Sequence, residues 1–146
     1  ALAAENVERL MVADRVRLIE SDLFSALDGE TYDLIVTNPP YVTRAEVAAL
    51  PDEYRHEPEN GLIAGEDGLD LALRIMRDAP AHLNDGGFLI CEVGESERAL
   101  VHLLLQIPFV WIEFKVGQMG IFCIEREDLL IWHREIAALA AEREGA

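Results

Sequence analysis

Apolar residues recur along this chain in two rhythms, which together predict helices that alternate with strands. Short alternating or continuous apolar runs predict strands at 16–20, 32–37, 88–93, 109–115 and 120–124. Apolar positions three and four residues apart predict helices at 1–11, 68–83, 96–105 and 128–143. This order is typical of an open α/β sheet, twisted and mostly parallel, with helices on both faces. A short turn around Gly117 joins the last two strands, which predicts an antiparallel C-terminal hairpin.

Local signals predict where several of these elements end. The run at 32–37 lies between a glycine and two prolines, and its composition predicts a strand buried on both faces. Pro39 and Pro40 then force the chain out of the sheet. Residues 84–87, Asn-Asp-Gly-Gly, are predicted to form a turn, and Ser96 to cap the helix after it. The connection from 38 to about 67 is long for a compact domain, and its capping-box pattern at 43–46 predicts a short helix.

Composition and charge narrow the class of protein. A chain of 146 residues with 51% hydrophobic residues fits one folded domain. Lys and Arg number 12 against 28 Asp and Glu, which gives a formal net charge of −16. A surface this acidic repels phosphate backbones, so direct binding of nucleic acid is not expected. A basic protein is the better-matched partner.

The cysteines and the hydropathy pattern give no sign of a metal site or a membrane segment. Cys91 and Cys123 lie in apolar runs without the CxxC spacing of a zinc site, and two thiols are too few for a disulfide scaffold. Both are predicted to be buried and reduced, as in the cytoplasm. No apolar run approaches the ~18 residues of a membrane span.

The strongest candidate for chemistry is Asn38-Pro39-Pro40-Tyr41, at the end of the predicted strand 32–37. Ligands of open α/β sheets bind beyond the carboxyl ends of the strands. The Asn38 side-chain oxygen and the neighbouring main-chain carbonyls would accept hydrogen bonds from a planar NH2 group, and Tyr41 would supply a flat wall beside it. The alternative is that Asn38 only forms a turn, since Asn-Pro dipeptides are common in loops.

A second candidate, Ser21-Asp22-Leu23-Phe24, follows the predicted strand 16–20. Asp22 at the carboxyl end of a strand has two interpretations. It is either a turn or helix cap, since Asp accepts backbone N–H bonds well, or a contact to a ligand. His56 has no partner at metal-ligand spacing and no nearby nucleophile, so no catalytic role is assigned to it.

The residues Asp33-Leu34-Ile35-Val36-Thr37-Asn38-Pro39-Pro40-Tyr41 resemble motif IV of the class I S-adenosylmethionine-dependent amino-methyltransferases. The upstream run from Ser21 to Leu27 resembles the protein-(glutamine-N5) methyltransferase branch of that family. Residues 50–58, Leu-Pro-Asp-Glu-Tyr-Arg-His-Glu-Pro, with 65–69, are similar to the members that methylate a glutamine of a large-subunit ribosomal protein. The resemblance extends from about residue 1 to 132 and implies a Rossmann-like methyltransferase fold.

The resemblance implies a role for each matching residue. Asn38, Pro39, Pro40 and Tyr41 would be the catalytic turn, which holds the acceptor amide while its nitrogen attacks the sulfonium methyl group of S-adenosylmethionine. Asp22, Leu23 and Phe24, with Asn38, would contact that cofactor, mainly on its adenine side. Tyr54, Arg55, Glu57 and Pro58 would belong to the substrate loop; alternatively, Arg55 and Glu57 are part of a solvated run of charges.

The sequence departs from the family pattern at its beginning. It has no glycine-rich cofactor loop, no acid for the ribose hydroxyls and no amino-terminal helical substrate domain. Residues 1–146 are therefore expected to be a C-terminal part of the catalytic domain, which alone binds S-adenosylmethionine weakly or not at all and is inactive. Without the family's first two strands, the sheet is expected either to pair strand 16–20 with 32–37 or to expose an edge. An exposed edge would favour a homodimer.

Two other functions remain open at this stage. The acceptor could be an exocyclic amine of DNA or RNA, although the net charge of −16 and the lack of a basic patch argue against it. Alternatively, the chain is a non-catalytic α/β module that binds proteins, which the absent glycine loop favours.

Overall fold

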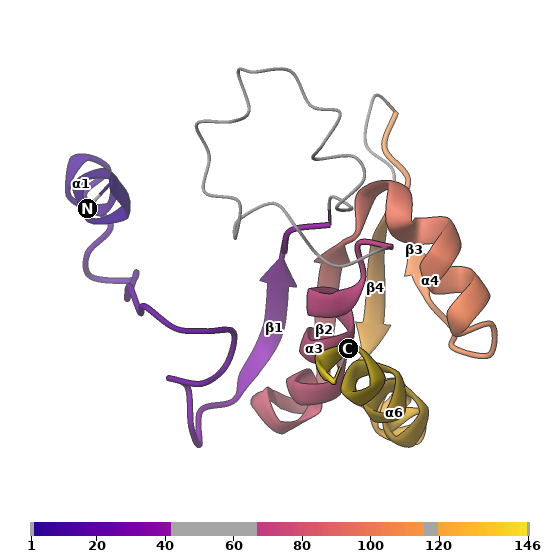
Figure 1. Cartoon of the computed structure of the whole chain (residues 1–146). Helices are drawn as coiled ribbons and strands as arrows, with labels where there is room; N and C mark the ends of the chain where they lie inside the picture. The colour runs from indigo at the N-terminus through magenta and orange to yellow at the C-terminus, as the bar shows by residue number, and fades with distance from the viewer. Residues whose placement is uncertain (1, 42–66, 116–119, 146) are drawn as a thin grey trace. The chain divides into compact units, whose positions relative to one another are not determined.

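The computed structural model describes residues 2–41, 67–115 and 120–145 (Figure 1). The chain forms two compact units, Ala1–Glu30 and Thr31–Ala146, and we describe each by itself. The elements in chain order are α1 (Leu2–Arg9), β1 (Tyr32–Thr37), α3 (Asp70–Asp78), the 3-10 helix η3 (Ala79–His82), β2 (Leu83–Glu92), the 3-10 helix η4 (Gly94–Ser96), α4 (Glu97–Leu103), β3 (Val110–Trp111), β4 (Ile121–Glu125), α5 (Arg126–Ile131) and α6 (His133–Glu144). The short helix predicted at 43–50 lies outside the described residues.

The first unit consists of α1 and an irregular segment. The helix predicted at 1–11 is confirmed, but the strand predicted at 16–20 is wrong, because residues 10–31 contain neither helix nor strand. Val16, Leu18 and Ile19 are exposed rather than packed on a sheet. A strand is stable only when a neighbour completes its hydrogen-bond ladder, and the described residues of this unit contain no second strand. An apolar alternation was therefore not sufficient to make one.

The second unit contains a mixed four-stranded sheet in the order β1-β2-β4-β3. β1 pairs with β2 in parallel, and β4 pairs antiparallel with both β2 and β3. β3 therefore runs in the same direction as β1 and β2, and β4 alone runs against them. This arrangement confirms the α/β class and the antiparallel C-terminal hairpin.

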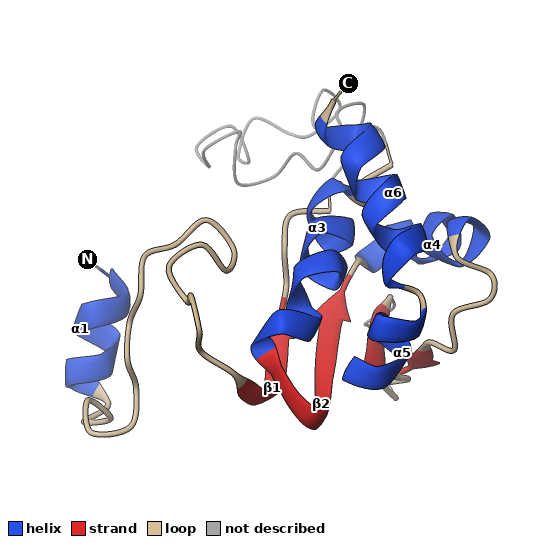
Figure 2. Cartoon of the chain, turned by 90° about the horizontal axis from the view of Figure 1, so that it is seen from below, coloured by secondary structure: helices blue, strands red, loops and turns tan. Residues whose placement is uncertain are grey.

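The core lies between one face of the sheet and the helices. Leu89 and Cys91 of β2 and Phe122 and Ile124 of β4 are almost completely buried, and Figure 2 shows α3 and α6 on that side of the sheet. Of the buried residues of α3, Ala72, Ile75 and Met76 follow the predicted helical spacing, and Leu73 is buried in addition to them. Phe122 also packs edge-on against Phe109 and Trp111, with ring centroids 4.8 and 5.8 Å away.

The opposite face of the sheet is open in the described residues. Leu34 is 51% exposed and Val36 67%, so the prediction that β1 is buried on both faces is wrong. β1 is the first strand of the sheet and pairs only with β2 among the described strands, and its partners Phe88 and Ile90 share the open face. Helices on both faces are therefore not confirmed. The exposed edge agrees with one of the two predicted arrangements, and a homodimer through it stays a prediction.

Two predicted element ends differ from the structure. Residues 84–87 do not end the preceding helix but lie within β2. They form an irregularity in the pairing, because Tyr32 pairs with Leu83 while Leu34, two residues further along β1, pairs with Phe88. Ser96 precedes α4 but makes no capping hydrogen bond through its side chain. The tight turn of η4 already brings the Ser96 N–H to the Val93 carbonyl, so the helix starts without a side-chain cap.

The predicted closing helix is two helices. α5 ends at Ile131 and α6 starts at His133, with Trp132 between them. The Trp132 N–H donates to the Asp128 carbonyl and the Ile136 N–H to the Trp132 carbonyl, so hydrogen bonding continues across the junction. The apolar spacing predicts the covered face in part, because Leu129 and Ile136 are fully buried whereas Leu130, expected on the same face, is 46% exposed. It does not predict the break.

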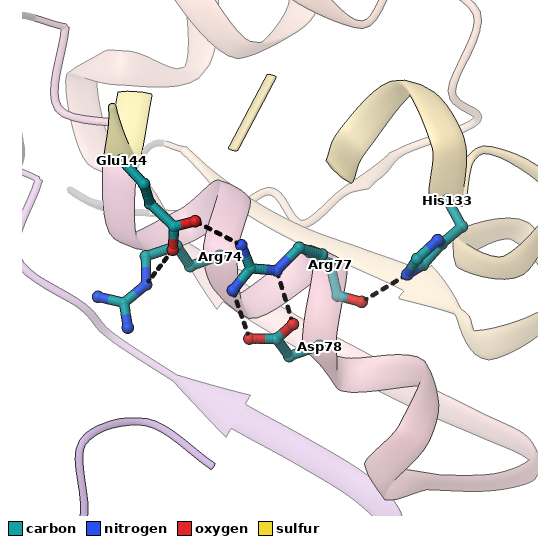
Figure 3. Close-up of polar contacts among 5 residues, drawn as sticks. All are labelled: Arg74, Arg77, Asp78, His133 and Glu144. Atoms are coloured by element: carbon teal, nitrogen blue, oxygen red, sulfur yellow. Dashed lines mark hydrogen bonds and ion pairs between the residues drawn. The ribbon is translucent and has the colours of Figure 1, made fainter. Parts of the chain in front are cut away.

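Polar contacts fasten α3 to α6 (Figure 3). Arg77 donates to Asp78 in its own helix and, at 2.9 Å, to Glu144 at the end of α6. Arg74 forms an ion pair with the same carboxylate at 3.2 Å, and His133 contacts the Arg77 carbonyl at 3.1 Å. These contacts hold the two ends of α6 against a single helix.

Arg143 of α6 anchors the chain just before α3. Its Nη1 and Nη2 atoms donate to both carboxylate oxygens of Asp67, at 2.5 and 2.8 Å, and Nη1 also reaches Asp70 at 3.2 Å. The hydrogen bonds from Arg143 lower the pKa of Asp67 below its ordinary value, and burial only partly opposes this. Asp67 is the first described residue after the gap at 42–66.

We expect Phe122→Ala to lower the free energy of unfolding by about 3–5 kcal/mol, because it removes a fully buried ring from the centre of the sheet. Phe114→Ala makes the same change at a ring that is 51% exposed and should cost well under half as much. Urea unfolding of both variants of this chain measures the difference. Equal losses would contradict this position of the core.

We expect Arg143→Met to destabilise the fold by about 1 kcal/mol at pH 7, since the pair is only partly buried. A carboxyl whose pKa is lowered by folding stabilises above its unfolded pKa, near 3.8 for Asp67, and this contribution disappears as the pH falls through the folded value. The difference in unfolding free energy between Arg143→Met and wild type should therefore become smaller below about pH 4. Thermal unfolding from pH 2 to 7 checks it, with the exposed Arg134→Met as control; a gap that does not change with pH would refute the anchor.

Candidate active site

The candidate site lies at the carboxyl ends of β1 and β2. Because the strands pair in parallel with Thr37 opposite Cys91, the residues that follow each strand start at the same edge of the sheet. Asn38 comes directly after β1, and Glu92 is the last residue of β2. The sequence predicts this edge as the ligand edge, and the structure places the asparagine there.

The side chains of the Asn38–Tyr41 turn differ in exposure. Asn38 is exposed, Pro39 is buried, and Pro40 and Tyr41 are half-buried. The buried Pro39 fixes the turn in the body of the unit, while the amide of Asn38 remains accessible to a ligand. Both proline rings restrict the backbone, which limits the directions of the carbonyl groups. The turn therefore combines an exposed amide at Asn38 with a buried and conformationally restricted base at Pro39.

Tyr41 is held by its hydroxyl group. The Tyr41 hydroxyl donates a hydrogen bond of 3.0 Å to Oε1 of Glu92, 51 residues along the chain. Burial raises the pKa of Tyr41 above its ordinary value, and the hydrogen bond and negative charge of Glu92 raise it further. Tyr41 therefore stays neutral and keeps donating to Glu92 across the physiological pH range.

Glycines leave the space that the Tyr41 turn occupies. A Cβ atom on Gly94 would lie 2.6 Å from Cε2 of the Tyr41 ring, and Gly94 has a φ of +51°, so a side chain is excluded on two grounds. A Cβ atom on Gly68 would lie 2.2 Å from the Tyr41 carbonyl oxygen. The Ser96 hydroxyl contacts the same oxygen at 3.5 Å. The turn thus packs against the residues that precede α3 and α4.

The predicted cofactor segment lies in the first unit. Ser21–Leu27 forms turns in which the Ser21 hydroxyl accepts the Ala26 N–H at 2.9 Å and the Asp22 carbonyl accepts the Ser25 N–H at 3.0 Å. The Ser21 hydroxyl thus closes this turn through its side chain, and Asp22 is exposed. Leu23 has a φ of +50°, a strained conformation for a branched side chain. Because Asp22 and Asn38 belong to different units, their meeting in one cofactor pocket stays a prediction.

The predicted substrate loop is not described. Tyr54, Arg55, Glu57 and Pro58 all lie in the gap at 42–66, so their role stays a prediction. The ends of the gap do meet, because Gly68 packs on the Tyr41 carbonyl. The connection therefore starts and finishes beside the candidate turn.

The described residues also limit other kinds of site. No group of three or more His, Cys, Asp or Glu within 2–41, 67–115 and 120–145 could hold a metal ion. Burial, with a smaller effect of Glu92, raises the pKa of the Cys91 thiol to about 12, which makes it a poor nucleophile. Across the same residues, no helix has the length and apolar character needed to cross a membrane.

Sequence reasoning missed Glu92 and Gly94. The one available signal was an acid at the end of an otherwise apolar strand, followed two residues later by a glycine. This pattern alone does not indicate a partner, because the contact with Tyr41 depends on the pairing of β1 with β2.

Comparison with known proteins yields close relatives. No protein-family model matches the chain. It is 62% identical over 143 residues, 98% of its length, to a protein of Xylella fastidiosa (strain Temecula1) named ribosomal protein uL3 glutamine methyltransferase, and it covers 46% of that protein. A protein of the same name from Xanthomonas campestris pv. campestris is 61% identical over 98% of this chain and 46% of its own length. A third, from Francisella tularensis subsp. tularensis, is 44% identical over 89% of this chain and 41% of its own length.

The chain thus spans about half the length of the curated relatives it matches. The identity nevertheless extends over nearly all of its own residues. This confirms the resemblance predicted from motif IV and its flanking segments: the chain is a homologue of the ribosomal protein uL3 glutamine methyltransferases.

Proposed function

We propose that the protein transfers a methyl group from S-adenosylmethionine to the side-chain amide nitrogen, N5, of a glutamine in ribosomal protein uL3. The name that the close relatives share supports methylation of a glutamine in uL3. The observation in this structure that supports it best is the exposed Asn38 at the carboxyl end of β1, on a turn fixed by a buried proline.

Asn38, Pro39 and Tyr41 have complementary roles in this proposal. The Asn38 side-chain oxygen and the Pro39 carbonyl accept the two N–H bonds of the glutamine amide, which orients its nitrogen. Tyr41 packs beside the amide plane. When bound, S-adenosylmethionine supplies an electrophilic methyl group whose bond to sulfur breaks as the new carbon–nitrogen bond forms, and the amide proton leaves to solvent. The protein thus contributes position and electrostatics.

The first unit offers groups that fit the cofactor. Asp22 is exposed and carries a carboxylate that can accept a hydrogen bond from an adenine amine. Leu23 and Phe24 are half-buried apolar side chains beside it, suited to the face of a purine ring. The glycine-rich loop and ribose-binding acid of the family do not occur in these 146 residues. We therefore propose that this chain alone holds the cofactor weakly and is inactive.

Charge supports a protein acceptor over the nucleic-acid alternative. The formal net charge of −16 attracts a basic protein and repels a phosphate backbone. The other alternative is a non-catalytic module that binds proteins. Absence of cofactor binding, even when these residues are part of a longer protein, would favour it. Action on a ribosomal protein also places the proposed activity in the cytoplasm.

We expect Asn38→Ala to lower kcat/KM for methylation of uL3 by about 100-fold or more, because it removes an acceptor that positions the attacking nitrogen. Transfer of labelled methyl groups to uL3 measures this in the natural gene product that contains these 146 residues. Asn84→Ala is the matched control, because Asn84 bonds Asp33 at the other end of β2. Near-wild-type turnover of Asn38→Ala would refute the assignment, and labelling of DNA or RNA instead of uL3 would favour the alternative acceptor.

For S-adenosylmethionine itself, we expect the 146-residue chain to show a Kd above about 1 mM, equivalent to a binding free energy weaker than about −4 kcal/mol. The full-length Xylella relative should bind in the micromolar range. Isothermal titration of both proteins under the same conditions measures the difference. Micromolar binding by the chain alone would show that the residues present here suffice for the cofactor.

A further inference from the structure

The contact between Tyr41 and Glu92 links the candidate turn to a different strand. The hydroxyl of Tyr41 donates to Glu92 at 3.0 Å, its ring lies against Gly94, and its carbonyl lies against Gly68 and Ser96. All of these partners lie 27 or more residues further along the chain. The position of Tyr41 therefore depends on residues that are distant in the sequence.

We propose that Glu92 is a positioning residue for the acceptor-binding turn, which fixes Tyr41 through its hydroxyl group and so keeps Asn38 and Pro39 in their working directions. This inference rests on the proposed function, because it assigns Glu92 a role in that same site. Glu92 does not touch the acceptor in this arrangement; it acts through Tyr41.

The geometry explains why both members of the pair are needed. Two prolines restrict the φ angles inside the turn, and the buried Pro39 anchors its start. The end of the turn, at Tyr41, is held by residues from elsewhere in the chain. Glu92 ends β2, the strand directly beside β1, so its carboxylate is a fixed point relative to Thr37. The hydroxyl is the atom of Tyr41 farthest from the backbone, so its hydrogen bond to Glu92 restrains the direction of the whole side chain.

The glycine at 94 completes the arrangement. The Tyr41 ring occupies the space that a side chain at Gly94 would need, and its hydroxyl reaches Glu92 from that position. Gly94 itself packs closely against Gly120, the residue that precedes β4, because a Cβ atom on Gly120 would lie 2.0 Å from the Gly94 carbonyl oxygen. The Val93 N–H donates to the Gly120 carbonyl at 2.7 Å. The central strands thus define where the tyrosine ring rests.

A positioning role predicts a particular pattern of kinetics in the natural gene product that contains these residues. Glu92→Ala should lower kcat for uL3 methylation about 10-fold or more while the KM for S-adenosylmethionine stays within about 2-fold. Glu92→Gln keeps an oxygen that accepts from Tyr41 and should recover most of that loss. Tyr41→Phe should resemble Glu92→Ala, and the double variant should be no slower than either single one. Glu95→Ala, an exposed acid three residues away, is the matched control.

A second measurement does not depend on activity. The charge and hydrogen bond of Glu92 contribute to the raised pKa of Tyr41. Glu92→Gln removes the charge and should therefore lower the pKa of Tyr41 toward its ordinary value. NMR of labelled tyrosine follows this in the 146-residue chain, and Tyr41→Phe identifies the resonance among the three tyrosines. Circular dichroism confirms that each variant is folded.

The outcomes separate this inference from the proposed function. Wild-type kcat in Glu92→Ala, additive losses in the double variant, or an unchanged Tyr41 ionisation in Glu92→Gln would each overturn the positioning role. If the wild-type protein methylates no uL3 but Tyr41 responds to Glu92 as expected, the proposed function fails while the contact stands.

Discussion

The parallel pairing of β1 with β2 is the constraint on which the candidate site depends. With Thr37 opposite Cys91, Asn38 and Glu92 come at the same edge of the sheet. A shift of one residue in this pairing would turn every side chain of β1 to the other face and move Glu92 out of reach of Tyr41. Ile35 and Thr37 of β1 pair with Leu89 and Cys91, which are fully buried, so this pairing joins β1 to the covered side of the sheet. The same pairing places the polar residues at the ends of both strands.

Several of the chain's positive charges are used to join its helices and strands to one another. Arg77, Arg126 and Arg143 bind carboxylates of this chain, where they fasten α3 to α6, β2 to α5 and the start of α3 to α6. These cations are used within the fold, so the acidic excess behind the net charge of −16 is left to act on the surroundings. A negative net charge together with an exposed asparagine is compatible with a basic protein that presents an amide, which is the acceptor in the proposed function.

The elements that could be predicted from the sequence are those whose signal is local. The helical character of α3, a strand over the apolar run of β2 and the antiparallel pairing of β3 with β4 are predicted correctly, since each depends on residues close in the chain. The bounds differ, because β2 begins at Leu83 and β3 covers only Val110–Trp111. The strand predicted at 16–20 did not form, because a strand also needs a neighbour, which periodicity cannot supply. The burial expected for Leu34 and Val36 failed for a similar reason: the edge position of β1 and its open face are properties of the whole sheet.

The candidate site divides along the same line. Asn38–Tyr41 was recognisable from four consecutive residues, because the two prolines restrict the backbone locally and the asparagine directly follows an apolar strand. Glu92 was not recognisable, since a single acid at the end of a strand has many bland explanations and its partner lies 51 residues away. The fold converts this separation into a contact by placing β1 beside β2. A motif in the sequence therefore indicates candidate residues for a substrate site, whereas the residues that contact that motif from other strands become visible only once the strands are paired.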